Sequence, residues 1–265
     1  MSSDTSSRIN SDVKPLLFQN ICCEYNMRGG ADEQGIGTYN EKRLHRIIKD
    51  YFDAEESDHE VPYRGHVADI KNDTGIIEVQ TGALNPLYMK LAVFLPEIEV
   101  TVVHPIIVKK KVFWIEPETG EISDGHLSPK RGCDYDGLVE LFNIRSHLTN
   151  PRLHIRFMMI AADEYRFNDG WDRSGKRGSH RYEYIPTELY DIISIDEASD
   201  YMRFLPDGLD VNDEGFTKNE YSAMIPRSVS SRRRSVTYAL NALVAAGVIK
   251  NAGKRKRANV YTLAE

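Results

Sequence analysis

HVADIKNDTGIIEVQTG, residues 66–82, consists of two short apolar runs separated by the compact polar turn NDTG. The pattern predicts two antiparallel β-strands joined by this turn. Residues two apart on a strand share a face, so Glu78 and Gln80 point to the same side of the second strand. The antiparallel return brings Asp69 level with Glu78 to within about one residue of register. Two carboxylates and an amide therefore converge near the strand ends.

Paired carboxylates in a sheet require an explanation, because two ionised side chains repel and burying either one unpaired is costly. A divalent cation relieves both problems. Mg²⁺ favours one or two carboxylates together with water and phosphate oxygens, and such an ion generates hydroxide and stabilises charge on a transferring phosphate. Asp69 and Glu78 thus indicate a Mg²⁺ (or Mn²⁺) site for phosphodiester hydrolysis. The alternative is a pair of solvent-facing acids on an edge hairpin.

The segments around the hairpin predict an α/β layered domain over residues 38–192. Apolar residues from Leu44 to Tyr51 recur at helical spacing after a plausible N-cap, Asn40. Branched residues in IEVTVVHPIIV predict a buried strand after the hairpin. The expected elements outside the hairpin are helices at 40–52, 84–95 and 134–148, and strands at 98–108, within 109–122 and at 153–162. The period of residues 15–25 is ambiguous, and residues 169–181 read as a polar loop.

The composition is that of an ordinary soluble globular chain of 265 residues, with 41% hydrophobic and 28% charged residues. No apolar run approaches the ~18 residues of a membrane span. The first residues, MSSDTSSRINSD, lack the basic-then-apolar order of a secretory signal. Three cysteines make neither a disulfide framework nor a metal-binding pair. We therefore expect a cytoplasmic protein without a membrane partner, and partial disorder over residues 1–37.

Charge is divided unevenly along the chain. Ten basic and two acidic residues give residues 216–265 a net charge of +8. Because the whole chain carries −6, the remaining residues carry −14. This asymmetry favours a nucleic-acid-binding module at the C-terminus, with a solvated basic surface as the alternative. We expect a helix and linker over 193–215, with the helix at 196–205. A short helix capped by Thr217, a helix over 230–247 and a hairpin over 248–263 follow.

This arrangement resembles a winged helix–turn–helix, which implies binding of duplex DNA; the alternative is a winged helix that makes protein contacts. In such motifs the N-terminal residues of the second helix contact base edges in the major groove. Opposite the apolar stripe of Val236, Leu240, Leu243 and Val244, the base-reading candidates are Ser231, Arg234, Ser235 and Tyr238. The candidates for phosphate or minor-groove contact are Arg232, Arg233, Lys254, Arg255, Lys256 and Arg257.

The hairpin also resembles a known family. An Asp on one strand and E-x-K on the next, in the order helix, three strands, helix, strand, is the pattern of the PD-(D/E)xK nuclease superfamily. Asp69 and the triplet Glu78-Val79-Gln80 match it, with Gln80 at the usual lysine position. The resemblance implies a restriction-endonuclease-like layered mixed sheet flanked by helices. It also implies that Glu41 joins the metal shell and that Lys90 stands where some members place a lysine that has moved to the next helix. The alternatives are that Glu41 pairs with a neighbouring base on its helix and that Lys90 is a solvated helix residue.

The leading prediction is a metal-dependent endonuclease that hydrolyses phosphodiester bonds in DNA held by the winged helix. Asp69 and Glu78 would ligate the metal, while Gln80, helped by Lys90, would orient the water or phosphate. The alternative is a DNA-binding regulator whose nuclease-like domain is inactive and serves ligand binding or dimerisation. RNA as the substrate and a homodimer are also compatible with the sequence.

Overall fold

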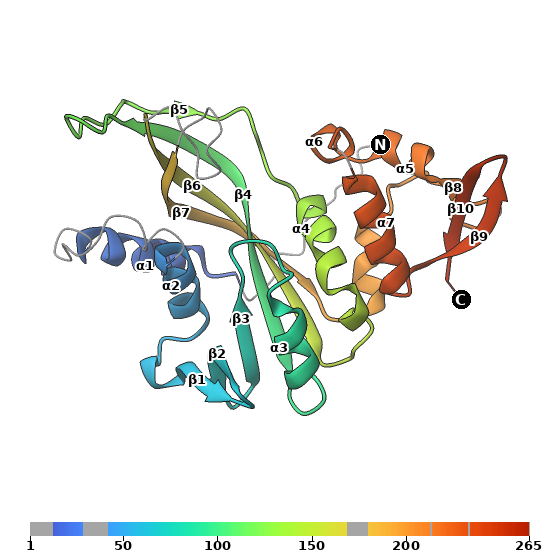
Figure 1. Cartoon of the computed structure of the whole chain (residues 1–265), viewed down its shortest axis with the longest axis horizontal. Helices are drawn as coiled ribbons and strands as arrows, with labels where there is room; N and C mark the ends of the chain where they lie inside the picture. Colours follow the sequence, from blue (N-terminus) through green and yellow to red (C-terminus); the bar gives the residue numbers. More distant parts are fainter. Residues whose placement is uncertain (1–12, 29–41, 169–179, 213, 233, 265) are drawn as a thin grey trace, which may run out of the picture.

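A computed structural model of the protein describes residues 13–28, 42–168, 180–212, 214–232 and 234–264 (Figure 1). Several expectations fall on positions outside these ranges: the helix N-cap Asn40, the metal ligand Glu41, the DNA-contacting Arg233, and most of the polar loop. Part of the N-terminal segment expected to be partly disordered is a helix, α1 (Pro15–Arg28).

The centre of the molecule is a seven-stranded mixed sheet of order β1-β2-β3-β4-β6-β7, with β5 paired to β4. Strands β3, β4 and β6 run parallel to one another, whereas β1, β2, β5 and β7 each pair antiparallel to their neighbour. The strands are β1 (His59–Tyr63), β2 (His66–Asn72), β3 (Gly75–Val79), β4 (Val100–Ile115), β5 (His126–Leu127), β6 (Leu153–Phe167) and β7 (His180–Ile195). The predicted α/β class, with a mixed sheet flanked by helices, is confirmed.

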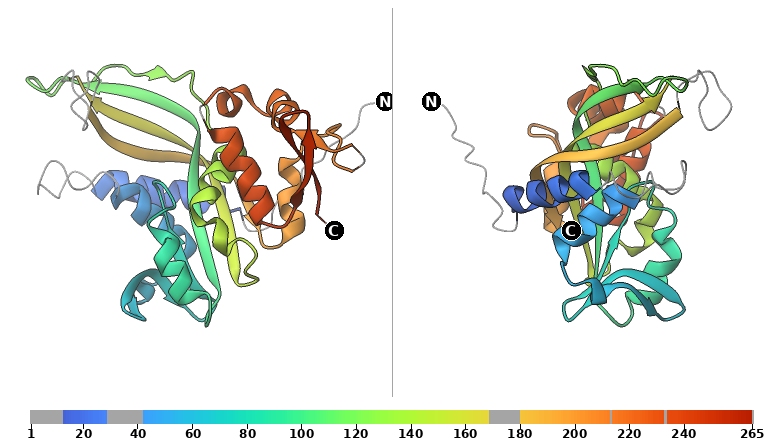
Figure 2. Two further views of the ribbon diagram at one scale, coloured as in Figure 1. Left: turned by 45° about the vertical axis from the view of Figure 1, so that its right-hand side comes forward. Right: turned by 90° about the vertical axis from the view of Figure 1, so that its left-hand side faces the viewer.

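Helices cover both faces of this sheet (Figure 2). On one face, α1 and α2 (Lys42–Phe52) bury Phe18, Ile47 and Ile48 against strand residues such as Ile77. On the other face lie α3 (Leu87–Phe94), α4 (Asp134–Leu141) and the 3₁₀ segment η2 (Phe142–His147). Within the described ranges, every helix is too short or too polar to traverse a bilayer.

A glycine inside α4 explains how closely this helix approaches the sheet. A Cβ atom on Gly137 would lie 2.6 Å from the Phe157 ring of β6, closer than real Cβ contacts allow. Glycine in a helix interior costs about 1 kcal/mol relative to alanine. The buried contact between α4 and Phe157 offsets that cost.

Several elements differ from the sequence-based expectations. Strand β1 and the 3₁₀ turn η1 (Glu56–Asp58) lie between the first expected helix and the hairpin, where no element was expected. HEVPY is an edge strand that contains a proline and no continuous apolar run, so its sequence pattern is weak. The two strands expected between residues 98 and 122 are one 16-residue strand, β4. The distal halves of β4, β6 and β7 form an arm that extends over α1 (Figures 1 and 2).

The C-terminal module contains helices and a three-stranded sheet of order β8-β10-β9. Its elements are η3 (Ala198–Phe204), β8 (Phe216–Thr217), α5 (Lys218–Met224), α6 (Arg227–Ser230), α7 (Ser235–Ala245), β9 (Ile249–Arg255) and β10 (Ala258–Leu263). Thr217 caps α5 through a capping box with Glu220, as predicted. The long helix starts later than predicted because Arg234 has a left-handed backbone (φ 72°), which ends the preceding turn. In the predicted stripe, Val236, Leu240 and Leu243 are buried but Val244 is exposed.

The two parts of the chain share one apolar core. Leu138 of α4 belongs to the same buried cluster as Tyr201, Phe216 and Leu243. The segment expected to be a linker is packed: Leu209 is buried, and the backbone N–H of Leu263 donates to the Val211 carbonyl over 2.8 Å. The C-terminal module is therefore fixed on the α/β domain.

An aromatic stack joins the two parts at their surface. The rings of Phe142 in η2 and Tyr238 in α7 lie 4.2 Å apart and are nearly parallel, at 5°. The guanidinium of Arg145 lies 4.2 Å from the Phe142 ring centroid, and Arg232 forms an ion pair with Asp136 of α4.

We predict that Tyr238→Ala lowers the free energy of unfolding by roughly 2–3 kcal/mol, because it removes both the buried ring area and the stacking contact. Tyr238→Phe keeps the ring and is the matched control, with a change below about 0.5 kcal/mol. Chemical denaturation monitored by fluorescence measures both variants. Equal stability of Tyr238→Ala and the parent protein would show that the stack contributes nothing to docking.

Candidate active site

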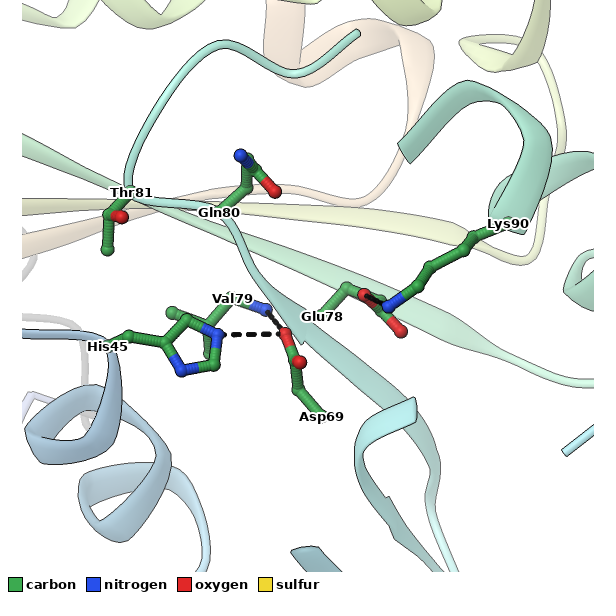
Figure 3. Close-up of a pocket in the computed structure, with 7 residues that line it drawn as sticks. All are labelled: His45, Asp69, Glu78, Val79, Gln80, Thr81 and Lys90. Carbon is green, nitrogen blue, oxygen red and sulfur yellow. Dashed lines mark hydrogen bonds and ion pairs between the residues drawn. The ribbon is translucent and has the colours of Figure 1, made fainter. Parts of the chain in front are cut away.

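A cleft of about 280 Å³ opens at the carboxyl end of β3, between α2 and α3 (Figure 3). Its lining residues are His45, Asp69, Glu78, Val79, Gln80, Thr81 and Lys90. The cleft brings together four of the residues that the sequence singles out: Asp69, Glu78, Gln80 and Lys90. These come from two adjacent strands and the helix that follows them.

The strand register brings the two carboxylates together. Ile70 pairs with Ile77, and continuing that antiparallel register by one residue sets Asp69 opposite Glu78. Asp69 Oδ2 accepts a hydrogen bond from the backbone N–H of Val79 over 2.8 Å. The predicted convergence of Asp69 with Glu78 is therefore present.

A histidine that the sequence analysis did not select holds Asp69. His45 Nε2 lies 3.1 Å from Asp69 Oδ2. Burial opposes ionisation of Asp69, but the hydrogen bond and charge of His45, together with the Val79 N–H, leave the pKa of Asp69 lowered. One signal was available in the sequence: His45 follows the predicted ligand Glu41 by four residues, the spacing of one face in the helix expected over residues 40–52. Glu41 itself lies outside the described residues.

Glu78 is the most deeply buried acid of the cleft, with 1% of its surface exposed. The ammonium group of Lys90 on α3 donates to Glu78 Oε2 over 2.8 Å. Burial and the neighbouring charge of Asp69 nevertheless raise the pKa of Glu78 to about 7, against the opposing effect of Lys90. Glu78 therefore changes its charge near neutral pH.

Gln80 is half-buried and lines the cleft, but its side chain points away from Asp69 and Glu78 (Figure 3). Its backbone is fixed on both sides: its N–H donates to the Val103 carbonyl over 2.9 Å, and its carbonyl pairs with Nδ1 of the buried His104 at 2.7 Å. The hydrogen bonds to β4 thus fix the backbone of Gln80 in the wall of the cleft.

The donor set of the cleft fits a hard divalent cation. Glu78 Oε1 is buried and has no hydrogen-bond partner among the described residues, and Asp69 supplies a second carboxylate nearby. Mg²⁺ keeps several waters and needs only one or two protein carboxylates. A cage of three or more His, Cys, Asp or Glu ligands is not found in the described part of the chain. Asp69 and Glu78 are the residues that would hold such an ion.

The predicted DNA-contacting residues divide into an exposed and an engaged set. Ser231, Arg234, Lys254, Lys256 and Arg257 are exposed. The engaged residues are Arg232, paired with Asp136; Ser235, which is buried; Tyr238, stacked on Phe142; and Arg255, bonded to Glu220 and to the Gly215 carbonyl. The expectation that Ser235 and Tyr238 lie on a free helix face is wrong, because Ser235 is buried and Tyr238 stacks on Phe142 of the α/β domain.

We predict that Glu78→Gln stabilises the metal-free protein at high pH. The Glu78 carboxyl ionises above about pH 4.5 in the unfolded chain, but only near pH 7 in the folded protein. The buried charge therefore lowers the free energy of unfolding, with no effect below about pH 4.5 and its full effect above about pH 7. The gain in unfolding free energy should be roughly 3 kcal/mol at about pH 8 and should vanish at about pH 4.

Denaturation with a chelator at both pH values measures this effect. Asp73→Asn, at the exposed turn of the same hairpin, is the control and should show no such pH dependence. An equal gain at both pH values would contradict the raised pKa.

Residues 42–196 match the family described as "Domain of unknown function (DUF8091)". An uncharacterized protein of Treponema pallidum (strain Nichols) is 30% identical over 165 residues, which cover 61% of this chain and 63% of that protein. The chain thus spans less than two thirds of the relative's length. No solved structure gives a significant match. Because the family match includes the entire large sheet and more than half of the sequence, this chain belongs to the DUF8091 family.

Proposed function

We propose that the protein is a metal-dependent endodeoxyribonuclease of the PD-(D/E)xK type, with a C-terminal winged helix that holds duplex DNA. The observation that carries this proposal is the convergence of Asp69, Glu78 and Lys90 in one cleft, with a buried carboxylate oxygen of Glu78 left without a hydrogen-bond partner among the described residues. The order α2, β1, β2, β3, α3, β4 supports the same superfamily, because it repeats its helix, three strands, helix, strand.

The C-terminal module supports the DNA-binding part of the proposal. Helices α5 and α7 are followed by the β9–β10 hairpin, with β8 preceding α5, which is the element order of a winged helix. The exposed bases at the hairpin tip, Lys254, Lys256 and Arg257, suit contacts with phosphates. Arg255 instead stabilises the module internally.

The residues of the cleft have distinct roles in this proposal. A bound Mg²⁺ would supply an activated water and offset charge on the phosphate. Asp69, kept ionised by His45, and Glu78, whose proton is lost near neutral pH, would hold the ion. Lys90 would release Glu78 and place its ammonium beside the scissile phosphate, a positive charge that Gln80 cannot provide. The half-buried amide of Gln80 would orient the attacking water or a phosphate oxygen.

An inactive nuclease-like domain in a DNA-binding regulator is the second candidate, and one observation favours it. Both carboxylates already have cationic or hydrogen-bonding partners within the protein, His45 and Lys90. A site balanced in this way is also compatible with a purely structural role.

We predict that the purified protein cuts or nicks DNA only with Mg²⁺ or Mn²⁺. Asp69→Asn and Glu78→Gln should each reduce cleavage to background, because each removes a metal ligand, while DNA binding measured by fluorescence anisotropy is unchanged. Asp73→Asn is the control that should retain cleavage. Cleavage that persists in both carboxylate variants would refute the catalytic assignment. Tight DNA binding without cleavage of duplex, branched or single-stranded substrates would favour the regulator.

A second prediction concerns the lysine. Lys90→Met should lower the cleavage rate by about 10²–10³, the usual cost of losing one group that stabilises transition-state charge. Adding Gln80→Lys to this variant returns a cation to the E-x-K position and should recover most of the rate. Single-turnover cleavage measures each step. If the double variant stays as slow as Lys90→Met, then Lys90 does not substitute for the superfamily lysine.

A further inference from the structure

We infer that α7 reads base edges of duplex DNA through the face that carries Arg234, Thr237 and Asn241. This inference rests on the proposed DNA binding and replaces the reading face that the sequence suggested. It follows from which sides of α7 are already occupied in the fold.

Two sides of α7 are used for packing. Val236, Leu240 and Leu243 are buried in the apolar core. Ser235, Tyr238 and Ala242 also recur at helical spacing. Ser235 and Ala242 are buried, and Tyr238 stacks on Phe142 of the α/β domain. Neither stripe can enter a DNA groove without undocking the module.

The third side of α7 is its most exposed side among the described residues. Thr237 is half-buried, Asn241 is exposed and Val244 is 39% exposed, at the helical spacing i, i+4, i+7. Arg234 is exposed directly before the first turn. In the major groove, asparagine bonds adenine N6 and N7 in a bidentate manner, arginine bonds guanine, and threonine or other methyl groups contact the thymine methyl. This exposed side of α7 therefore carries side chains suited to contacts with base edges.

Exposed basic residues lie on the elements next to α7, and one of them contacts this polar stripe. Lys218 at the start of α5 donates from Nζ to Thr237 Oγ1 over 2.6 Å, so α5 begins beside the stripe. Arg227 and the hairpin bases Lys254, Lys256 and Arg257 are exposed. Glu220, an acid in the same turn as Lys218, has its carboxylate bonded to the Thr217 N–H and to Arg255. Exposed bases on α5, α6 and the β9–β10 hairpin suit contacts with phosphates, while the polar stripe of α7 suits base edges.

Selection of binding sites from a random duplex library tests the reading face. The full chain carries Asp69→Asn in every case, so that the DNA stays intact. The parent should enrich a motif containing an A·T pair. Adding Asn241→Ala should remove the preference at that pair and weaken binding to the enriched site by roughly ten- to a hundredfold, with non-specific binding unchanged. Asn212→Ala, at an exposed position outside α7, is the matched control. Lys256→Ala should weaken all sequences alike and lower the salt slope by about 0.9.

The outcomes distinguish failure of the reading face from failure of the proposed DNA binding. If Asn241→Ala and Thr237→Val both select the parent's motif with the parent's affinity, the reading face is wrong while DNA binding stands. Binding without any sequence preference also overturns the reading face. If the parent binds no duplex at low salt, or binds only RNA, both the reading face and the proposed duplex binding fail.

Discussion

The three central strands β3, β4 and β6 run parallel, and the positions of the other elements depend on this constraint. Parallel neighbours cannot be joined by a tight turn, so each connection must cross a face of the sheet, usually as a helix. The first crossover contains α3 and the second contains α4 and η2, and both lie on the same face. Because of the first crossover, Lys90 reaches Glu78. Because of the second, a helix is available on which the C-terminal module docks.

The parts of the fold that the sequence predicted are those with strong local periodicity. The hairpin around residues 66–82 combines two apolar runs with a turn sequence, and its carboxylates meet because an antiparallel register leaves them little freedom. Helix α2 and the capped α5 have clear helical spacing or a capping box. The edge strand β1 has no such pattern, and no local signal joins the two strands expected within β4 into one. Both features depend on pairing with distant strands.

The candidate site was only partly predictable for a related reason. Asp69, Glu78 and Lys90 are separated by short, regular elements, so local spacing was enough to bring them together. His45 reaches Asp69 from α2, which packs on the face of the sheet opposite α3. This contact depends on tertiary packing. The same limit applies to α7: helical spacing identifies which residues share a side, but not that the side of Tyr238 is covered by Phe142.

The shared core also governs how the chain can be divided. The family match ends at residue 196, yet Tyr201, Phe204 and Phe216 lie in one apolar cluster with Leu138 and Leu141 of α4. A fragment cut at that boundary would expose the outer side of α4 to water, and contiguous apolar surfaces of this kind promote self-association. A fragment that can be expressed or fused intact must therefore extend beyond residue 196, because it must include the C-terminal residues that pack on α4.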